Sequence, residues 1–147
     1  MVLALANFVG KLIKDICGKY DNGSTGNNCA HFVGHALAYR LPGAALCSNC
    51  AGTLYTYAER TKGFCIRVDQ IYNSLSNRGG WPQVSPTSQC IVVATIHSNL
   101  TDKDNHKIGD NPRKHIGIFY NGNVCNYSNT QDWPTRSVVD GSVECSN

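Results

Sequence analysis

The chain has 147 residues, a length typical of one compact domain that can bury about two-thirds of its unfolded surface. Hydrophobic residues make up 41% and charged residues 16%, which excludes global disorder, because disordered chains have few core-forming side chains and a high net charge. The formal net charge of +3 is not concentrated in a run of Lys or Arg, so no nucleic-acid partner is indicated. We predict a single domain over residues 1–147.

The N-terminal apolar residues do not predict a transmembrane segment. Residues 1–7 are apolar except for Asn7, but Lys11, Lys14 and Asp15 interrupt the pattern before the roughly 18 to 20 residues that a membrane span needs. A charged n-region followed by a continuous apolar core is also missing. We therefore expect no membrane span, and either a mature chain or an export route that uses no signal peptide.

The chain contains eight cysteines, many for a reducing cytosol, and we expect an oxidising location such as a periplasm or the extracellular space. If one cysteine stays a thiol, seven remain, so at most three disulfides can form and their pairing cannot be deduced. Cys47 and Cys50 form a single CxxC with irregular spacing to Cys65 and Cys90. Structural disulfides explain these residues more simply than a zinc site or a redox disulfide, and we predict no metal and no cofactor.

Helices are predicted in the first half of the chain. Residues 4–19 have apolar side chains at helical spacing, and residues 29–39 should form a second helix that Asn28 caps after the turn-forming segment 21–28. Leu41-Pro42-Gly43 ends that helix. Residues 43–65 have neither helical nor strand periodicity and are expected to form a loop. A short helix is predicted over residues 68–75.

Strands are predicted in the second half. The β-branched run Cys90 to Ile96 predicts a buried strand, and the polar segment 98–112 predicts a long loop of functional or mobile character. Residues 115–120 and 123–128 flank Asn121-Gly122, the preferred pair for a type I′ turn, and should form a hairpin. Helices followed by an antiparallel sheet indicate the α+β class.

Cys29 is the first candidate for chemistry. A thiol attacks as the thiolate, which is favoured by a helix N-terminus or a neighbouring histidine, and Cys29 is expected to have both. Unpaired backbone N–H groups at the helix start can also hold an oxyanion. The alternative is that Cys29 is an ordinary buried or disulfide-bonded cysteine.

His115 begins the predicted hairpin and is the candidate base. A two-residue turn pairs Tyr120 with Asn123 and Gly117 with Asn126, so His115, Gly117 and Asn126 share one face of the sheet. Gly117 would leave room beside the imidazole, and the Asn126 amide oxygen could accept its second ring N–H and fix the tautomer. A register change of one residue would replace Asn126 by Cys125 on that face.

The remaining histidines rank below His115. His31 and His35 are four residues apart on one helix, a spacing that can bind metal, but two ligands do not make a site. His97, at the end of the strand that begins at Cys90, is an alternative base. His106 lies in the polar segment.

Two strings resemble papain-like NlpC-type and CHAP peptidoglycan amidases. These are Cys29-Ala30-His31-Phe32-Val33, at a helix start, and His115-Ile116-Gly117-Ile118-Phe119, on a downstream strand. The resemblance covers about residues 15–40 and 90–130. Asn28, Ala30 and His31 depart from the Asp, Ser and Gly of familiar members. The first string also resembles lecithin-retinol acyltransferase-like proteins, in which, however, the catalytic histidine precedes the cysteine.

The resemblance implies a papain-like core and a secreted hydrolase that cleaves amide bonds in peptidoglycan stem peptides. Cys29 would be the nucleophile, His115 the base and then the acid, and Asn126 the orienting residue, while Tyr20 would help to line the site. The layout is similar to that of type VI secretion amidase effectors, which implies an immunity or inhibitor protein as a partner. A thiol acyltransferase and a non-enzymatic disulfide-rich binding module are the alternative functions.

Overall fold

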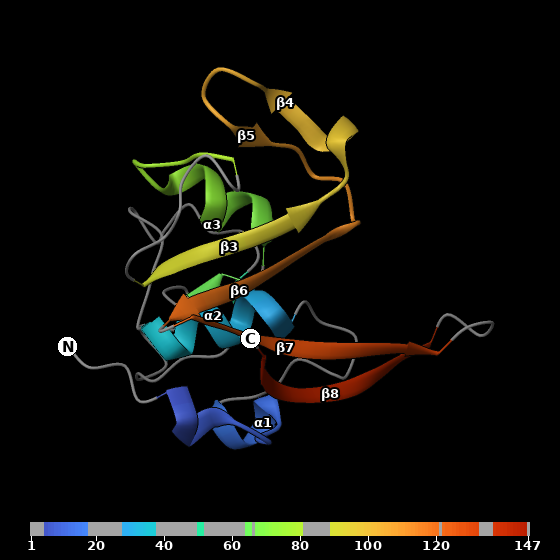
Figure 1. Ribbon diagram of the computed structural model, residues 1–147. Coiled ribbons are helices and arrows are strands. Elements are labelled where there is room, and N and C mark those ends of the chain that lie inside the picture. Colours follow the sequence, from blue (N-terminus) through green and yellow to red (C-terminus); the bar gives the residue numbers. More distant parts are fainter. Residues whose placement is uncertain are drawn as a thin grey trace, which may run out of the picture.

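A computed structural model describes residues 5–17, 28–37, 50–51, 64–65, 67–80, 89–120, 122–132 and 137–146 (Figure 1). The described elements comprise short helices and antiparallel sheets, in agreement with the predicted α+β class. The N-terminal part contains the 3-10 helix η1 (Leu5–Phe8), α1 (Ile13–Ile16) and α2 (Asn28–Leu37). The short strands β1 (Cys50–Ala51) and β2 (Phe64–Cys65) and the helix α3 (Val68–Ser74) follow.

The main sheet has four antiparallel strands in the order β3-β6-β7-β8. They are β3 (Cys90–Thr95), β6 (Lys114–Tyr120), β7 (Asn123–Asp132) and β8 (Ser137–Ser146). Figure 1 shows α2 against β6 and β7, and α3 beside β3. The pairs Gly117↔Asn126 and Tyr120↔Asn123 confirm the predicted hairpin register.

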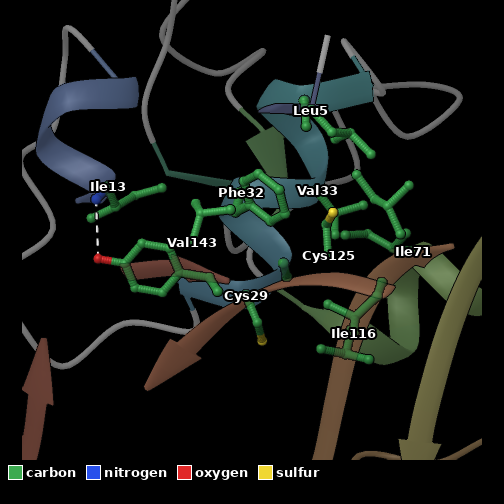
Figure 2. Close-up of a cluster of buried hydrophobic side chains, with 14 of the residues drawn as sticks. Leu5, Ile13, Cys29, Phe32, Val33, Ile71, Ile116, Cys125 and Val143 are labelled. Carbon is green, nitrogen blue, oxygen red and sulfur yellow. Dashed lines mark hydrogen bonds between the residues drawn. The ribbon is translucent and has the colours of Figure 1, made fainter. Parts of the chain in front are cut away.

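The hydrophobic core lies between α2 and this sheet. Phe32 and Val33 of α2 are buried in one cluster with Ile116 and Ile118 of β6 and with Tyr127 of β7. Figure 2 shows this cluster, including a hydrogen bond of 3.0 Å that the backbone N–H of Ile13 donates to the Tyr127 hydroxyl. The apolar residues of α2 therefore pack on one face of the β6–β7 hairpin.

The predicted helix over residues 4–19 is wrong as a continuous element. The chain leaves the helical conformation after η1, and Gly10 has φ +78, a left-handed conformation that glycine adopts without steric cost. Gly10 N–H donates to the Val143 carbonyl at 2.9 Å, and Val143 N–H donates to the Lys11 carbonyl at 3.1 Å. These bonds to β8 replace the helical bonds, and α1 starts only afterwards.

The segment 98–112 is not an irregular loop as predicted. It contains the 3-10 helix η4 (His97–Asn99) and a small hairpin of β4 (Leu100–Asp102) and β5 (Lys107–Ile108). The buried Asn99 supports its base, because its side-chain amide donates to Thr95 Oγ1 at 2.8 Å and its oxygen accepts from the backbone N–H of Asn111 at 3.2 Å. Polar side chains thus order this segment where apolar ones are scarce.

Three further expectations differ in detail. β3 is an edge strand and is only partly buried rather than fully buried, because it pairs with β6 alone among the described strands. Asn28 is the first residue of α2 instead of its cap. Residues 43–65 contain β1 and β2, which pair Cys50 with Cys65 across the strands, where only loop was expected.

The described cysteines include one disulfide, Cys125–Cys145, which joins directly paired positions of β7 and β8. Cys29 and Cys90 carry thiols. None of the helices in the described part of the chain is long and apolar enough to cross a membrane.

Candidate active site

Cys29 lies at the start of α2, as predicted. It is the second residue of the helix, so its backbone N–H has no helical carbonyl four residues earlier to bond. The residue is 3% exposed and belongs to the buried cluster. Figure 2 shows its side chain pointing away from Phe32 and Val33.

His115 is the second residue of β6, and the neighbouring strands and α3 fix its position. It pairs with Ala94 of β3. The preceding residue, Lys114, forms an ion pair of 3.3 Å with Asp69 of α3, which also accepts two hydrogen bonds from Arg67. The beginning of β6 is therefore held by β3 on one side and by α3 on the other.

Asn126 is the third residue of the candidate site, with Cys29 and His115. His115 Nε2 lies 3.0 Å from Asn126 Oδ1. An amide oxygen only accepts hydrogen bonds, so Nε2 carries a proton and donates it. In the neutral imidazole this leaves Nδ1 unprotonated, which is the form a base needs. The orienting hydrogen bond that the hairpin pattern predicts is present.

The imidazole of His115 also interacts with Cys29. A hydrogen bond with Cys29 raises the pKa of His115, burial lowers it, and the charge interaction with Cys29 and the hydrogen bond with Asn126 raise it further. The net result is a pKa above the ordinary value of 6.5. The interactions with Cys29 and with the Asn126 amide oxygen thus both favour the protonated form of the His115 ring.

Gly117 has a role beyond the expected room beside the imidazole. A Cβ built on Gly117 would lie 2.9 Å from the Cys125 carbonyl oxygen and 3.2 Å from the Asn126 Cβ. The missing side chain therefore lets β7 approach β6 closely, next to the hydrogen bond between His115 and Asn126. The imidazole of His115 is not among the nearest atoms.

A cavity of about 280 Å³ lies on this face of the sheet. His115, Gly117 and Asn126 line it together with four apolar residues, Val92, Val93, Ala94 and Val124. His115 thus connects the buried thiol to an open surface. These apolar residues were not singled out in the sequence, although the alternation along β3 and β7 places Val92, Ala94 and Val124 on the same face as His115.

The other predicted candidates lie elsewhere. Tyr20 lies outside the described residues. His97 is exposed in η4, and His106 is in the turn between β4 and β5 with φ 50. His31 and His35 both lie on α2. The imidazole whose pKa Cys29 raises is that of His115.

Comparison with known proteins assigns no family. No family model, no curated protein and no solved structure matches this chain.

Proposed function

We propose that the chain is a cysteine amidase that cleaves amide bonds in the stem peptides of peptidoglycan. The observation that carries this proposal is one imidazole that is hydrogen-bonded to an amide oxygen and whose pKa responds to a thiol. His115 Nε2 lies 3.0 Å from Asn126 Oδ1, and the interaction with Cys29 is the largest cause of the raised pKa of His115. Such an arrangement activates a nucleophile and fixes the tautomer of its base.

The acylation step follows from this geometry. His115 Nδ1 takes the thiol proton of Cys29, and the thiolate attacks the amide carbonyl carbon, forming a C–S bond and an oxyanion. The backbone N–H of Cys29, at the helix start, is a donor for this oxyanion. His115 then returns the proton to the leaving nitrogen as the C–N bond breaks, which releases an amine and leaves a thioester on Cys29.

Deacylation uses the same groups. His115 takes a proton from water, the resulting hydroxide attacks the thioester carbonyl, and the C–S bond breaks with release of a carboxylic acid. The sulfur leaves as thiolate, which recovers the proton from His115. Asn126 holds the ring in one orientation through both steps, because its oxygen accepts the Nε2 proton throughout.

Two observations support peptidoglycan stem peptides as the substrate class. The motifs around Cys29 and His115 resemble those of the NlpC-type and CHAP amidases, in which the nucleophile precedes the base in the chain. The cavity of about 280 Å³ beside His115 is near the lower bound of small-ligand sites, roughly 300 Å³, and suits a short peptide segment. Secretion into an oxidising compartment and a papain-like core belong to the same proposal.

The proposal is tested by incubating purified peptidoglycan with the wild type and with Cys29→Ala, followed by mass spectrometry of the soluble fragments. We expect new amine and carboxylate ends from the wild type only. Cys90→Ala is the matched control, because Cys90 is also a thiol but lies on β3. Equal cleavage by the wild type and Cys29→Ala would reject the proposal.

A second assay separates the acyltransferase alternative. The same proteins are given a phospholipid with an amine acceptor, and acylated products are sought. Transfer of a lipid acyl group that requires Cys29, without release of peptidoglycan fragments, would assign the thiol to that chemistry instead. Mass mapping of Cys29 in active protein tests the binding-module alternative, which needs this cysteine to be oxidised.

A further inference from the structure

Three metal-ligating side chains converge away from the proposed active site. They are Cys17, which follows the last residue of α1, and His31 and His35, on consecutive turns of α2. One ligand atom from each, the sulfur or a ring nitrogen, lies within 4.8 Å of the other two. Among the described residues, no fourth Cys, His, Asp or Glu belongs to this group.

We propose that Cys17, His31 and His35 bind one divalent metal ion of the zinc type. A thiolate and two imidazoles are the ligands that zinc prefers, whereas magnesium and calcium prefer oxygen. The ligands come from two separate elements, so the ion would join the end of α1 to the middle of α2. The metal-binding spacing of His31 and His35 gains its third ligand only through the fold.

The spacing of the two histidines fits a shared ion. His31 Nε2 and His35 Nε2 are 3.1 Å apart. Two nitrogens at the usual zinc distance of about 2.0 to 2.1 Å, at tetrahedral angles, are separated by about 3.3 Å. The two Nε2 atoms are therefore already at nearly the separation that a shared zinc ion needs. The Cys17 sulfur, within 4.8 Å of the ring nitrogens, needs to move closer by about 1.2 Å at most to complete a tetrahedral face.

Burial indicates a structural site rather than a catalytic one. Cys17 is 1% exposed and His31 is 0% exposed, while His35 is partly exposed. Binding needs neutral imidazoles and a deprotonated thiol, so one zinc ion displaces the thiol proton of Cys17 and the proton that joins the two rings.

The cluster is distinct from the proposed catalytic group. Cys29 is on the same helix, but its position two residues before His31 points it about 200° around the helix axis. The sulfur of Cys29 interacts with His115, which belongs to the sheet. A metal at the cluster would therefore support the helix that carries Cys29 without contacting the thiol.

The test uses the full chain, purified anaerobically without thiol reductants and stripped of metal with a chelator. We expect the wild type to take up one equivalent of Zn²⁺ and to show a higher Tm with it. With Co²⁺ it should show a thiolate-to-cobalt charge-transfer band in the near ultraviolet. His35→Gln should weaken Zn²⁺ binding by at least about 100-fold, because even loss of a residue that merely orients a ligand costs about 10- to 100-fold.

The variants distinguish the ligands from other thiols and histidines. Cys17→Ser should abolish the charge-transfer band, whereas Cys29→Ala and His97→Gln should keep it. His35 is the safest position to change, because it is only partly buried. If folded wild type takes up no Zn²⁺, the site does not exist. The proposal would also be overturned if the wild type and folded His35→Gln bound Zn²⁺ with equal affinity. It would be overturned as well if the charge-transfer band were lost in Cys29→Ala and kept in Cys17→Ser.

Discussion

His115 on β6 and Asn126 on β7 are held 3.0 Å apart by a hydrogen bond that depends on the register of one hairpin. Gly117 pairs directly with Asn126, two residues along β6 from the histidine. A shift of one residue would turn Asn126 to the other face and bring the disulfide-bonded Cys125 towards His115. The register, and not only the identity of these residues, therefore makes the candidate site.

Replacing Asn126 with Ala should lower the pKa of His115, because a hydrogen bond that favours the imidazolium is lost. We also expect kcat/KM for peptidoglycan hydrolysis to fall by about 100-fold, the usual cost of a misplaced catalytic group. NMR titration of the His115 ring measures the first effect, and fragment release measures the second. Asn123→Ala, on the same strand, should change neither. An unchanged ring titration in Asn126→Ala would exclude the orienting role.

The contribution of His115 to stability should depend on pH. Its pKa in the folded protein is raised, first through the hydrogen bond with Cys29, so the folded state binds the proton more tightly than the unfolded state. The stabilisation is fully present below the unfolded value of about 6.5 and is lost as the pH rises through the raised value. Urea unfolding of the wild type and His115→Ala should therefore differ more at pH 5.5 than at pH 8.5. A larger difference at pH 8.5 would mean that the shift has the opposite sign.

Gly117→Ala should disturb the site without touching a polar group. The added methyl would lie 2.9 Å from the Cys125 carbonyl oxygen, a backbone atom that can move only if β7 moves. We expect a loss of about 1 to 3 kcal/mol in the free energy of unfolding and a lower pKa of His115, because β7 carries Asn126 away. Chemical denaturation and ring titration measure these effects. Gly122→Ala, where nothing lies within 4 Å of a Cβ but φ is +81, is the control for backbone strain alone.

The hairpin was predictable from sequence because its signals are local. Asn121-Gly122 set the loop length, and the alternation of residues 115–120 set which face is buried. The structure gives Gly122 the positive φ of +81 that such a turn needs. Ile116 and Ile118 are fully buried, on the face opposite to that of His115.

The remaining differences come from contacts between distant parts of the chain. The break near Gly10 depends on hydrogen bonds to Val143, more than 130 residues away in sequence, and no helical periodicity reveals them. The group of Cys17, His31 and His35 depends on how α1 meets α2. Two histidines at helical spacing were visible in the sequence, but the third ligand was not.

The small hairpin of β4 and β5 gives a last prediction, because one side chain attaches it to α3. Asn73 Nδ2 donates to the Ile108 carbonyl at 2.8 Å, and the Ile108 N–H donates to Asn73 Oδ1 at 3.0 Å, so the amide acts like a strand partner. Asn73→Ala removes both bonds and leaves the main-chain groups of the buried Ile108 unsatisfied, which should cost about 1 to 3 kcal/mol. Asn73→Asp keeps an acceptor for the Ile108 N–H but loses the donor, and its cost should be smaller. Asn77→Ala, at an exposed position beyond α3, is the control. Hydrogen exchange should show faster exchange at Ile108 in Asn73→Ala than in the wild type, while equal rates would mean that the hairpin holds its position without this amide.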